Sequence, residues 1–283
     1  SSVINVGAKP IFAEVDINSG NITADSISNV LTSKTKAVLC VHLAGWPCDM
    51  TPIMGLANKR NFFVIEDCAQ AHGAKYDGES VGSIGHIGAW SFCQDKIIST
   101  AGEGGMVIFK SKKIYNKAKI LRDHGMSLKK RYWHEVVGYN YRMTNLQAAI
   151  GLAQLEKFKE IINFKIKIAE FYKDSFKNIK FLKIQKNSKE IINSYWAFGV
   201  IFTNKKINFK KIQEKLFNSG IETNNFFYPL NVQSPYKNIK TCESLKNSIN
   251  LSNNGILLPT FNGLKEDELR YIVKNFIKII NKI

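Results

Sequence analysis

The sequence is poor in proline and has no long apolar run. Six prolines occur in 283 residues, and no apolar stretch approaches the roughly 18 residues that a membrane span requires. Residues 1–5 contain no basic region followed by an apolar core, so no secretory signal is visible. No proline-rich linker, repeat or low-complexity tract interrupts the chain. These absences predict a globular cytoplasmic protein without a membrane partner.

Cysteines are few and show no paired spacing. They are Cys40, Cys48, Cys68, Cys93 and Cys242. Their number is odd, and no two of them have the close spacing that is typical of zinc ligands. We therefore expect reduced, mostly buried thiols, with neither a disulfide framework nor a metal site.

Arginine is scarce although the chain is basic. The net charge is +17, but only five of the 40 basic residues are arginine. Residues 1–105 carry a net charge of −3, and the remainder carries +20. Proteins that bind bases and phosphates usually depend on the planar guanidinium of arginine, and no zinc-finger or RNP-like motif occurs. We therefore predict no nucleic-acid partner and interpret the lysines as solvated helix faces. The alternative is a positive field that steers an anionic diphosphate-sugar toward the active site.

Strand and helix signals alternate through the first half of the chain. Apolar and β-branched runs predict strands, and the stretches between them predict helices, the first of them capped by Thr23. Such alternation predicts an α/β fold with a mainly parallel sheet, helices on both faces, and ligands bound beyond the carboxyl ends of the strands. The predicted strands are 10–15, 37–42, 62–67 and 106–109, and the predicted helices are 24–32, 50–60 and 111–122.

A smaller α+β unit is predicted beyond about residue 170. A long helix begins near Thr144, and its apolar stripe is interpreted as core packing. We expect a large domain over 1–170 and a small C-terminal domain over 171–283, packed as one body. The stripe consists of Leu146, Ala149, Ile150 and Ala153, and the later elements are strands at 195–202 and 256–258 and helices near 208–218 and 265–282.

A single lysine lies between an apolar run and a cluster of glycines. Lys96 follows residues 88–92 and precedes glycines at 102, 104 and 105, while Asp67 ends another apolar run upstream. A lysine amine can form a Schiff base with an aldehyde, and a carboxylate keeps a pyridine nitrogen protonated. Pyridoxal phosphate (PLP) chemistry needs this pair. By spacing alone, however, the two residues are more often a surface lysine in a turn and an aspartate at a strand end.

The sequence around these two residues resembles the DegT/DnrJ/EryC1/StrS family of PLP-dependent aminotransferases. The resemblance extends from about Val6 to the C-terminal helix. Members of this family act on nucleotide-linked keto-sugars. The resemblance also implies an aspartate aminotransferase-like fold (fold type I). The matching words are IEDCAQAHGA at 65–74, VGS at 81–83, SF at 91–92, GEGGM at 102–106, YNYRM at 139–143, QAA at 147–149, FYPL at 227–230 and LLP at 257–259.

The resemblance also implies a role for each matching polar residue. Lys96 would bind PLP covalently and move a proton between substrate and cofactor carbons. Asp67 would pair with the pyridinium nitrogen, Gln70 would lie beside the ring, and Ser91 would donate to the phosphate. Asn140 would reach the phosphate of a neighbouring subunit's cofactor, so a homodimer with shared sites is expected. The amino donor expected is glutamate, for glycan biosynthesis.

Two nearby residues keep open alternatives. His72 either faces the site or is a structural histidine, and Arg142 either contacts an anionic ligand or braces its loop. Asn224 stands where many relatives have arginine, which we expect to alter substrate handling. We expect the glycines at 102, 104 and 105 to adopt positive φ angles and to allow the backbone to approach closely near Lys96.

Three other functions compete with an aminotransferase. The first is a sugar dehydratase of the same family, but those enzymes have histidine at the position of Lys96. The second is an inactive truncated fragment or a PLP-free scaffold, and the third is a nucleic-acid binder. Relative to the family, about a quarter of the usual sequence is missing, including a Ser-Gly-Thr turn that binds the phosphate. We therefore expect weak PLP retention and little turnover unless such a segment is added.

Overall fold

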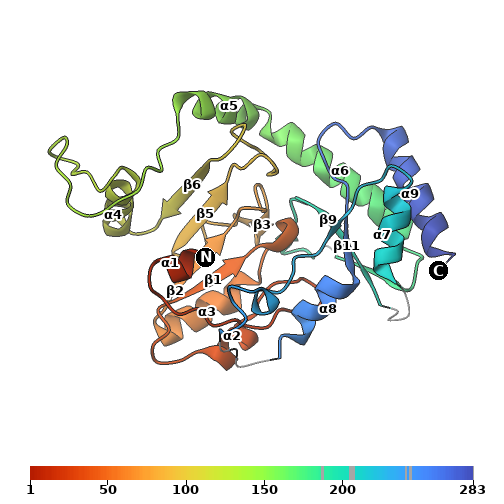
Figure 1. The fold of residues 1–283 in the computed structure, drawn as a ribbon, viewed down its shortest axis with the longest axis horizontal. Helices are drawn as coiled ribbons and strands as arrows, with labels where there is room; N and C mark the ends of the chain where they lie inside the picture. The colour runs from red at the N-terminus through yellow and green to blue at the C-terminus, as the bar shows by residue number, and fades with distance from the viewer. Residues whose placement is uncertain (186–187, 204–207, 240, 242–243, 283) are drawn as a thin grey trace.

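Figure 1 shows a computed structural model, which describes residues 1–185, 188–203, 208–239, 241 and 244–282, so Cys242 lies outside the described residues. Two sheets dominate the structure. The first has the order β1-β2-β5-β6, in which β1, β2 and β5 are parallel and β6 is antiparallel. This mostly parallel sheet confirms the predicted fold class. The bounds are β1 Ala37–Val41, β2 Phe63–Asp67, β5 Ile87–Ser91 and β6 Gly105–Phe109.

Two helices cover one face of the first sheet. Thr23 caps α2 as predicted, in a reciprocal capping box with Ser26. Apolar side chains of α2 and α3 pack on the alternate residues Cys40 and Val64 of β1 and β2. Burying each large apolar side chain contributes about 1.5–3 kcal/mol to the free energy of folding, which stabilises the packing of these helices on the sheet. The helices are α2 Ala24–Val30 and α3 Met50–Arg60, and their buried residues are Ile27, Met50, Ile53 and Ala57.

The opposite face of this sheet carries Asp67 and is largely open. Residues opposite one another in register point to the same side, so Leu39, Phe63 and Val107 share this face with Asp67. They are 42%, 50% and 47% exposed. The expected burial of both faces is therefore not found at these three positions.

The second sheet is antiparallel and has the order β10-β11-β9-β7. Helices α6, α7 and α9 pack on one side of it around Tyr172, Phe198 and Phe276. The predicted strands and helices of this region are confirmed, with small shifts at their ends. The bounds are α6 Phe158–Phe176, β7 Leu182–Ile184, β9 Phe198–Phe202, α7 Phe209–Phe217, β10 Asn224–Asn225, α8 Lys246–Asn254, β11 Gly255–Leu258 and α9 Glu266–Ile280.

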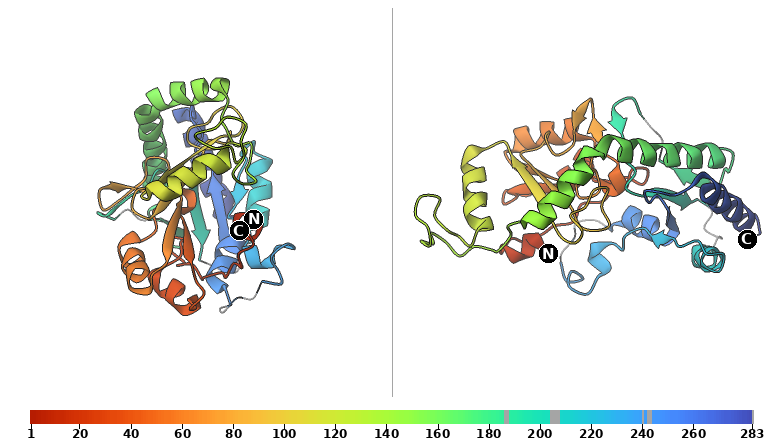
Figure 2. Two further views of the ribbon diagram at one scale, coloured as in Figure 1. Left: turned by 90° about the vertical axis from the view of Figure 1, so that its left-hand side faces the viewer. Right: turned by 90° about the horizontal axis from the view of Figure 1, so that it is seen from above.

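Helices α5 and α6 run one after the other from the first sheet to the second (Figures 1 and 2). The predicted domain boundary at residue 170 falls inside α6, and the division into two domains stays a prediction. No helix in the described parts of the chain is long and apolar enough to cross a membrane. The remaining elements are α1 Ser2–Asn5, η1 Leu43–Gly45, β3 Lys75–Tyr76, β4 Glu79–Ser80, α4 Lys112–Arg122, α5 Asn145–Glu156, β8 Ile191–Ile192 and η2 Leu230–Val232, of which β4, β3 and β8 form a third, small sheet.

Two sequence predictions are wrong. The segment 10–15 is not a strand, since only Val15 forms an isolated bridge, with Ile22. Instead, the Glu14 carboxylate accepts hydrogen bonds from the N–H groups of Asn247 and Ser248 in the first turn of α8, which anchors the segment without a strand partner. The apolar stripe of α5 is not core in this chain, because Leu146 is 79% exposed and Ile150 is 41% exposed.

Candidate active site

The carboxyl ends of β2 and β5 bring Asp67 and Ser91 to the same edge of the sheet. Asp67 is the last residue of β2 and pairs with Ala89, two residues before the end of β5 at Ser91. One carboxylate oxygen of Asp67 accepts from the N–H of Ala69 at 3.0 Å. The Ser91 hydroxyl accepts from the N–H of Cys93 at 3.2 Å. Ligands of parallel α/β sheets bind at this kind of edge.

Lys96 lies in the segment that joins β5 to β6. The segment is held closed because the N–H of Thr100 donates to the carbonyl of Phe92 at 3.0 Å, and the Lys96 N–H donates to the carbonyl of Cys93 at 3.0 Å. A Cβ atom at Gly104 would lie 2.4 Å from the Thr100 hydroxyl, so the expected close approach is confirmed there. The Lys96 side chain is only 14% exposed, and its Nζ pairs with Asp95 Oδ2 at 2.9 Å.

Gln70 connects the loops that follow β1 and β2. Its side-chain oxygen accepts from the N–H of Ala44 at 2.8 Å. Ala44 itself has a positive φ of 55°, in the 3-10 turn that begins directly after His42. The amide of Gln70 therefore stabilises a backbone conformation that few non-glycine residues adopt.

His72 is buried next to the segment that follows β5. It is 3% exposed, and neither ring nitrogen makes a hydrogen bond to a described side chain. Its ring lies 5.8 Å from that of Phe92, in the segment between Ser91 and Lys96. Burial lowers the pKa of His72 to about 4, the Ser91 backbone opposes this shift, and the positive charge of Lys96 adds to it. His72 is thus neutral at physiological pH.

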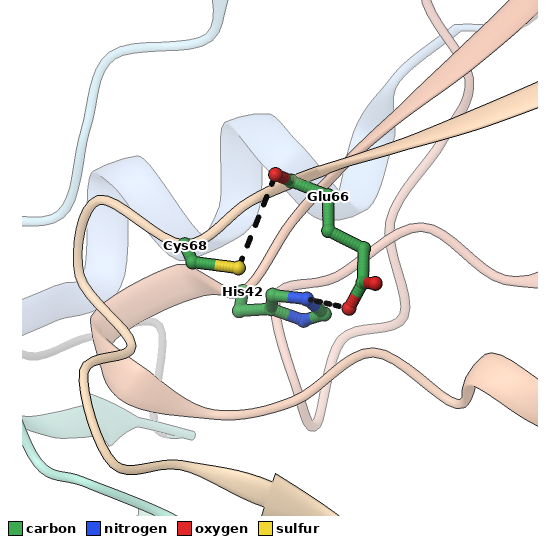
Figure 3. Close-up of side chains that lie close together, drawn as sticks. All are labelled: His42, Glu66 and Cys68. Atoms are coloured by element: carbon green, nitrogen blue, oxygen red, sulfur yellow. Dashed lines mark hydrogen bonds and ion pairs between the residues drawn. The ribbon is translucent and has the colours of Figure 1, made fainter. Parts of the chain in front are cut away.

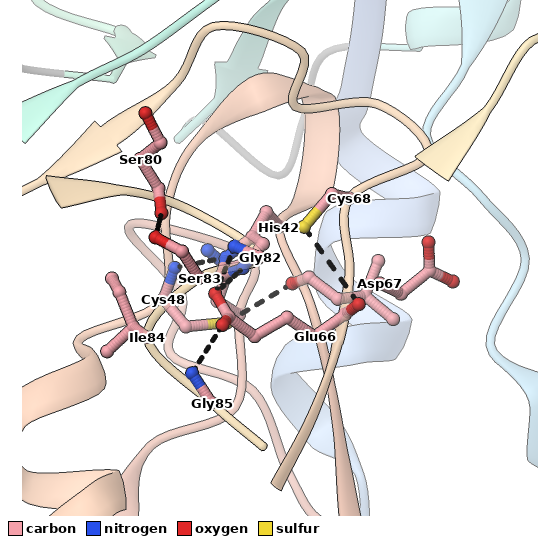
Figure 4. Close-up of polar contacts among 12 residues, drawn as sticks. His42, Cys48, Glu66, Asp67, Cys68, Ser80, Gly82, Ser83, Ile84 and Gly85 are labelled. Carbon is pink, nitrogen blue, oxygen red and sulfur yellow. Dashed lines mark hydrogen bonds and ion pairs between the residues drawn. The ribbon is translucent and has the colours of Figure 1, made fainter. Parts of the chain in front are cut away.

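Directly behind the sheet edge, His42, Glu66 and Cys68 form a buried cluster (Figure 3), whose ligand atoms all lie within 4.8 Å of one another. His42 Nδ1 accepts from the N–H of Cys48 at 3.0 Å, so Nε2 carries the proton and donates to Glu66 Oε2 at 3.0 Å. The other acceptor sites of the carboxylate bind the N–H groups of Gly82 and Gly85 (Figure 4). Because hydrogen bonds already occupy these atoms, the cluster is a structural network.

The network keeps Glu66 ionised inside the protein. Burial opposes ionisation, but the hydrogen bonds from His42, Gly82 and Gly85 prevail and lower the pKa of Glu66 below its usual value. Burial raises the pKa of the neighbouring Cys68 thiol, and the charge of Glu66 adds to this effect. Figure 4 shows the Asp67 carboxylate on the opposite side of β2 from Glu66.

Asn140 and Arg142 lie on the loop between α4 and α5, which projects from the body of the molecule at the left of Figure 1. Asn140 is exposed, and it forms an isolated antiparallel β-bridge with Asp123. Arg142 Nε lies 3.5 Å from Asp123 Oδ1, so in this chain Arg142 braces the loop. None of the described hydrogen bonds connects Asn140 to Lys96, Asp67 or Ser91 of the same chain.

A cavity of about 1000 Å³ opens beside Lys96, at the upper end of the range of small-molecule sites. Besides Lys96, its lining includes Lys165, Trp196, Glu222 and Asn224. Neither Lys165 nor Trp196 was predicted from the sequence, because both come from elements far along the chain and no local motif marks them.

The model of the DegT/DnrJ/EryC1/StrS aminotransferase family matches residues 1–277. The chain belongs to this family. Two similar members are named GDP-perosamine synthase. That of Escherichia coli O157:H7 is 41% identical, over 95% of this chain and 72% of its own length, and that of Vibrio cholerae is 37% identical, over 99% and 77%. The solved structure of an aminotransferase from Psychrobacter cryohalolentis has a TM-score of 0.92 at 36% identity, covering 100% of this chain and 78% of that one.

Family membership implies PLP, and the residues of this chain fit it. PLP carries an aldehyde, a ring nitrogen and a phosphate. Lys96 offers an amine on the wall of a cavity, Asp67 a carboxylate and Ser91 a hydroxyl at the neighbouring strand ends.

Proposed function

We propose that the protein is a PLP-dependent aminotransferase that moves an amino group from glutamate to a keto-sugar linked to a nucleoside diphosphate. The observation that carries the proposal is the placement of Lys96, largely buried yet lining a large cavity, in a chain of this aminotransferase family. Similar members named for a GDP-linked amino sugar support the substrate class. Cytoplasmic location and a role in polysaccharide biosynthesis belong to the same proposal.

In this proposal each residue has a defined task. PLP, when bound, supplies an electron sink that stabilises negative charge on the substrate carbon. Lys96 holds the cofactor and then moves a proton at its Nζ. The carboxylate of Asp67 keeps the ring nitrogen protonated, Gln70 fixes the loop beside the ring, and the hydroxyl of Ser91 binds the phosphate.

A lysine at position 96 also favours this reaction over dehydration by a member of the same family. Enzymes of that second type are expected to have histidine at this position, whereas the nearest histidine in the chain sequence, His86, precedes β5 and lies outside the β5–β6 segment.

The test of the proposal is the visible absorption of bound PLP. In the presence of excess PLP, the protein is expected to show a visible absorption band that free PLP lacks, and Lys96→Ala is expected to lose this band. Lys59→Arg, at an exposed lysine in the last turn of α3, is the control and should keep it. Protein that takes up no PLP, or a Lys96→Ala variant with an unchanged band, contradicts the assignment.

We further propose a homodimer that shares its active sites. Exposed apolar side chains on β6, the 123–144 loop and α5 support an interface there, since such a surface is costly to leave in water. Asn140 lies on the same loop. These side chains are Met106, Val107, Val137, Tyr141, Leu146, Leu152 and Leu155.

We expect Leu146→Glu with Leu152→Glu to convert a dimer into monomers. Both side chains are more than half exposed in the single chain, so the folded subunit should tolerate the change, whereas an interface would bury four added charges per dimer. Sedimentation at micromolar concentration measures the result, with Lys59→Glu as the control. A parent protein that sediments only as a monomer in the presence of PLP argues against shared sites.

A further inference from the structure

We propose that Trp196 is a positioning residue for Lys96: its indole fixes the backbone beside the lysine and its ring covers the lysine amine. The inference rests on the proposed function of Lys96 as the reactive lysine. It adds a second contact region to the site, one that comes from the C-terminal half of the chain.

Two contacts join Trp196 to the lysine segment. The indole N–H donates to the backbone carbonyl of Asp95 at 2.7 Å, a short and well-formed hydrogen bond. Lys96 Nζ lies 5.1 Å from the centre of the indole ring, within the range of a cation–π contact. The carboxylate of Asp95 holds the same amine at 2.9 Å. The amine of Lys96 therefore contacts both the carboxylate of Asp95 and the indole face of Trp196.

Trp196 is itself held from two further elements. Its backbone carbonyl accepts from the Thr260 hydroxyl at 2.9 Å and lies 3.4 Å from Lys165 Nζ. Lys165, on α6, also donates to the carbonyl of Thr260 at 2.8 Å. The Phe227 ring stacks against the indole, with centres 6.1 Å apart and planes 20° apart.

Lys165 has the environment of a structural anchor. It is 5% exposed, and among the described residues no carboxylate is recorded within ion-pair distance of its amine. Burial alone lowers its pKa to about 8. A buried amine bonded to two carbonyls joins two segments of the cavity wall, at Trp196 before β9 and at Thr260 after β11.

The contacts form one path from α6 to the reactive amine. Lys165 and Thr260 fix the Trp196 backbone, and Trp196 fixes Asp95 and covers Lys96. A lysine side chain has four rotatable bonds, so an amine without such restraint samples many positions. Because group transfer depends on the position of the reacting amine to within about 1 Å, the restraint bears directly on rate.

The test compares Trp196→Phe and Trp196→Leu with Trp133→Phe, a matched change at an exposed tryptophan of the 123–144 loop. Each protein is saturated with added PLP, and the glutamate half-reaction is followed in single turnover. Trp196→Phe keeps a ring but loses the N–H donor, so a fall of about 10-fold in rate constant is expected, and about 100-fold for Trp196→Leu. The dissociation constant for glutamate should change less than the rate constant.

Two readouts are independent of turnover. PLP titration should show weaker binding in both Trp196 variants, and PLP should quench less of the tryptophan emission once Trp196 is gone, whereas Trp133→Phe should leave the quenching intact. Thr260→Val, which removes only the hydroxyl bonded to the Trp196 carbonyl, should change PLP affinity and rate in the same direction by a smaller factor.

The outcomes separate the inference from its premise. If Lys96→Ala loses the visible band but the Trp196 and Thr260 variants match Trp133→Phe in rate, affinity and quenching, the role of Trp196 is wrong and the proposed function stands. If Lys96→Ala keeps the band, both are wrong. Should the Trp196 variants fail to fold, an unchanged Thr260→Val overturns the inference and a weakened one supports it.

Discussion

Lys96→Arg is expected to slow both half-reactions by at least about 10³-fold while leaving the fold intact. Arginine keeps the positive charge next to Asp95, so the local ion pair can persist. Its guanidinium stays protonated at any pH at which the protein is folded, so it neither attacks an aldehyde nor accepts a proton from a substrate carbon. The measurement is the single-turnover absorbance change on adding glutamate, and then on adding a nucleotide-linked keto-sugar.

The control for this variant is Lys59→Arg, which makes the same chemical change on the exposed surface of α3. Its rates should equal those of the parent. A Lys96→Arg protein that transaminates within about tenfold of the parent rate would mean that another group moves the proton.

Glu66→Ala is expected to cost about 3–5 kcal/mol of unfolding free energy, the largest stability effect of any single change proposed. The substitution removes a buried carboxylate and leaves the His42 N–H and two glycine N–H groups without an acceptor. Urea unfolding measures the loss. Glu79→Ala, at an exposed position of β4, is the matched control and should change the free energy by no more than about 0.5 kcal/mol.

The stabilisation by Glu66 should also depend on pH. The folded state holds the pKa of this carboxyl below its usual value, so the unfolded chain binds a proton at higher pH than the folded protein does. The contribution is therefore complete above the unfolded pKa of about 4.3 and is lost as the pH falls through the folded pKa. The gap in stability between the parent and Glu66→Gln should narrow as the pH falls below about 4.3. A gap that stays constant would mean that the charge contributes nothing.

The local signals in the sequence predicted local structure well. Thr23 marked the start of α2, and the run that ends at Asp67 marked β2, because capping and apolar patterns act over a few residues. The edge position of Asp67 followed from the order of elements. The strand predicted over 10–15 failed because a strand needs a neighbour, and that neighbour is set by the tertiary fold.

Contacts between distant segments were beyond prediction. The stripe on α5 has helical spacing in the sequence whether it faces a core or open surface, so the pattern could not tell that Leu146 is exposed. The role of Glu66 was not predicted, since its partners come from two loops far from it in the sequence, His42 after β1 and Gly82 and Gly85 between β4 and β5. Trp196 approaches Lys96 from 100 positions later in the chain.

The two adjacent acids of β2 point to opposite faces of the sheet and have different roles. Glu66 points to the closed side and binds three donors, whereas Asp67 points to the open side and the sheet edge. Because side chains alternate along a strand, a slip of one residue would exchange the two carboxylates. The misplaced Asp67 would be too short to reach the donors of Glu66, and Glu66 would replace it at the edge. The register that keeps Glu66 among its three buried donors is therefore also the register that directs Asp67 to the open face of the sheet.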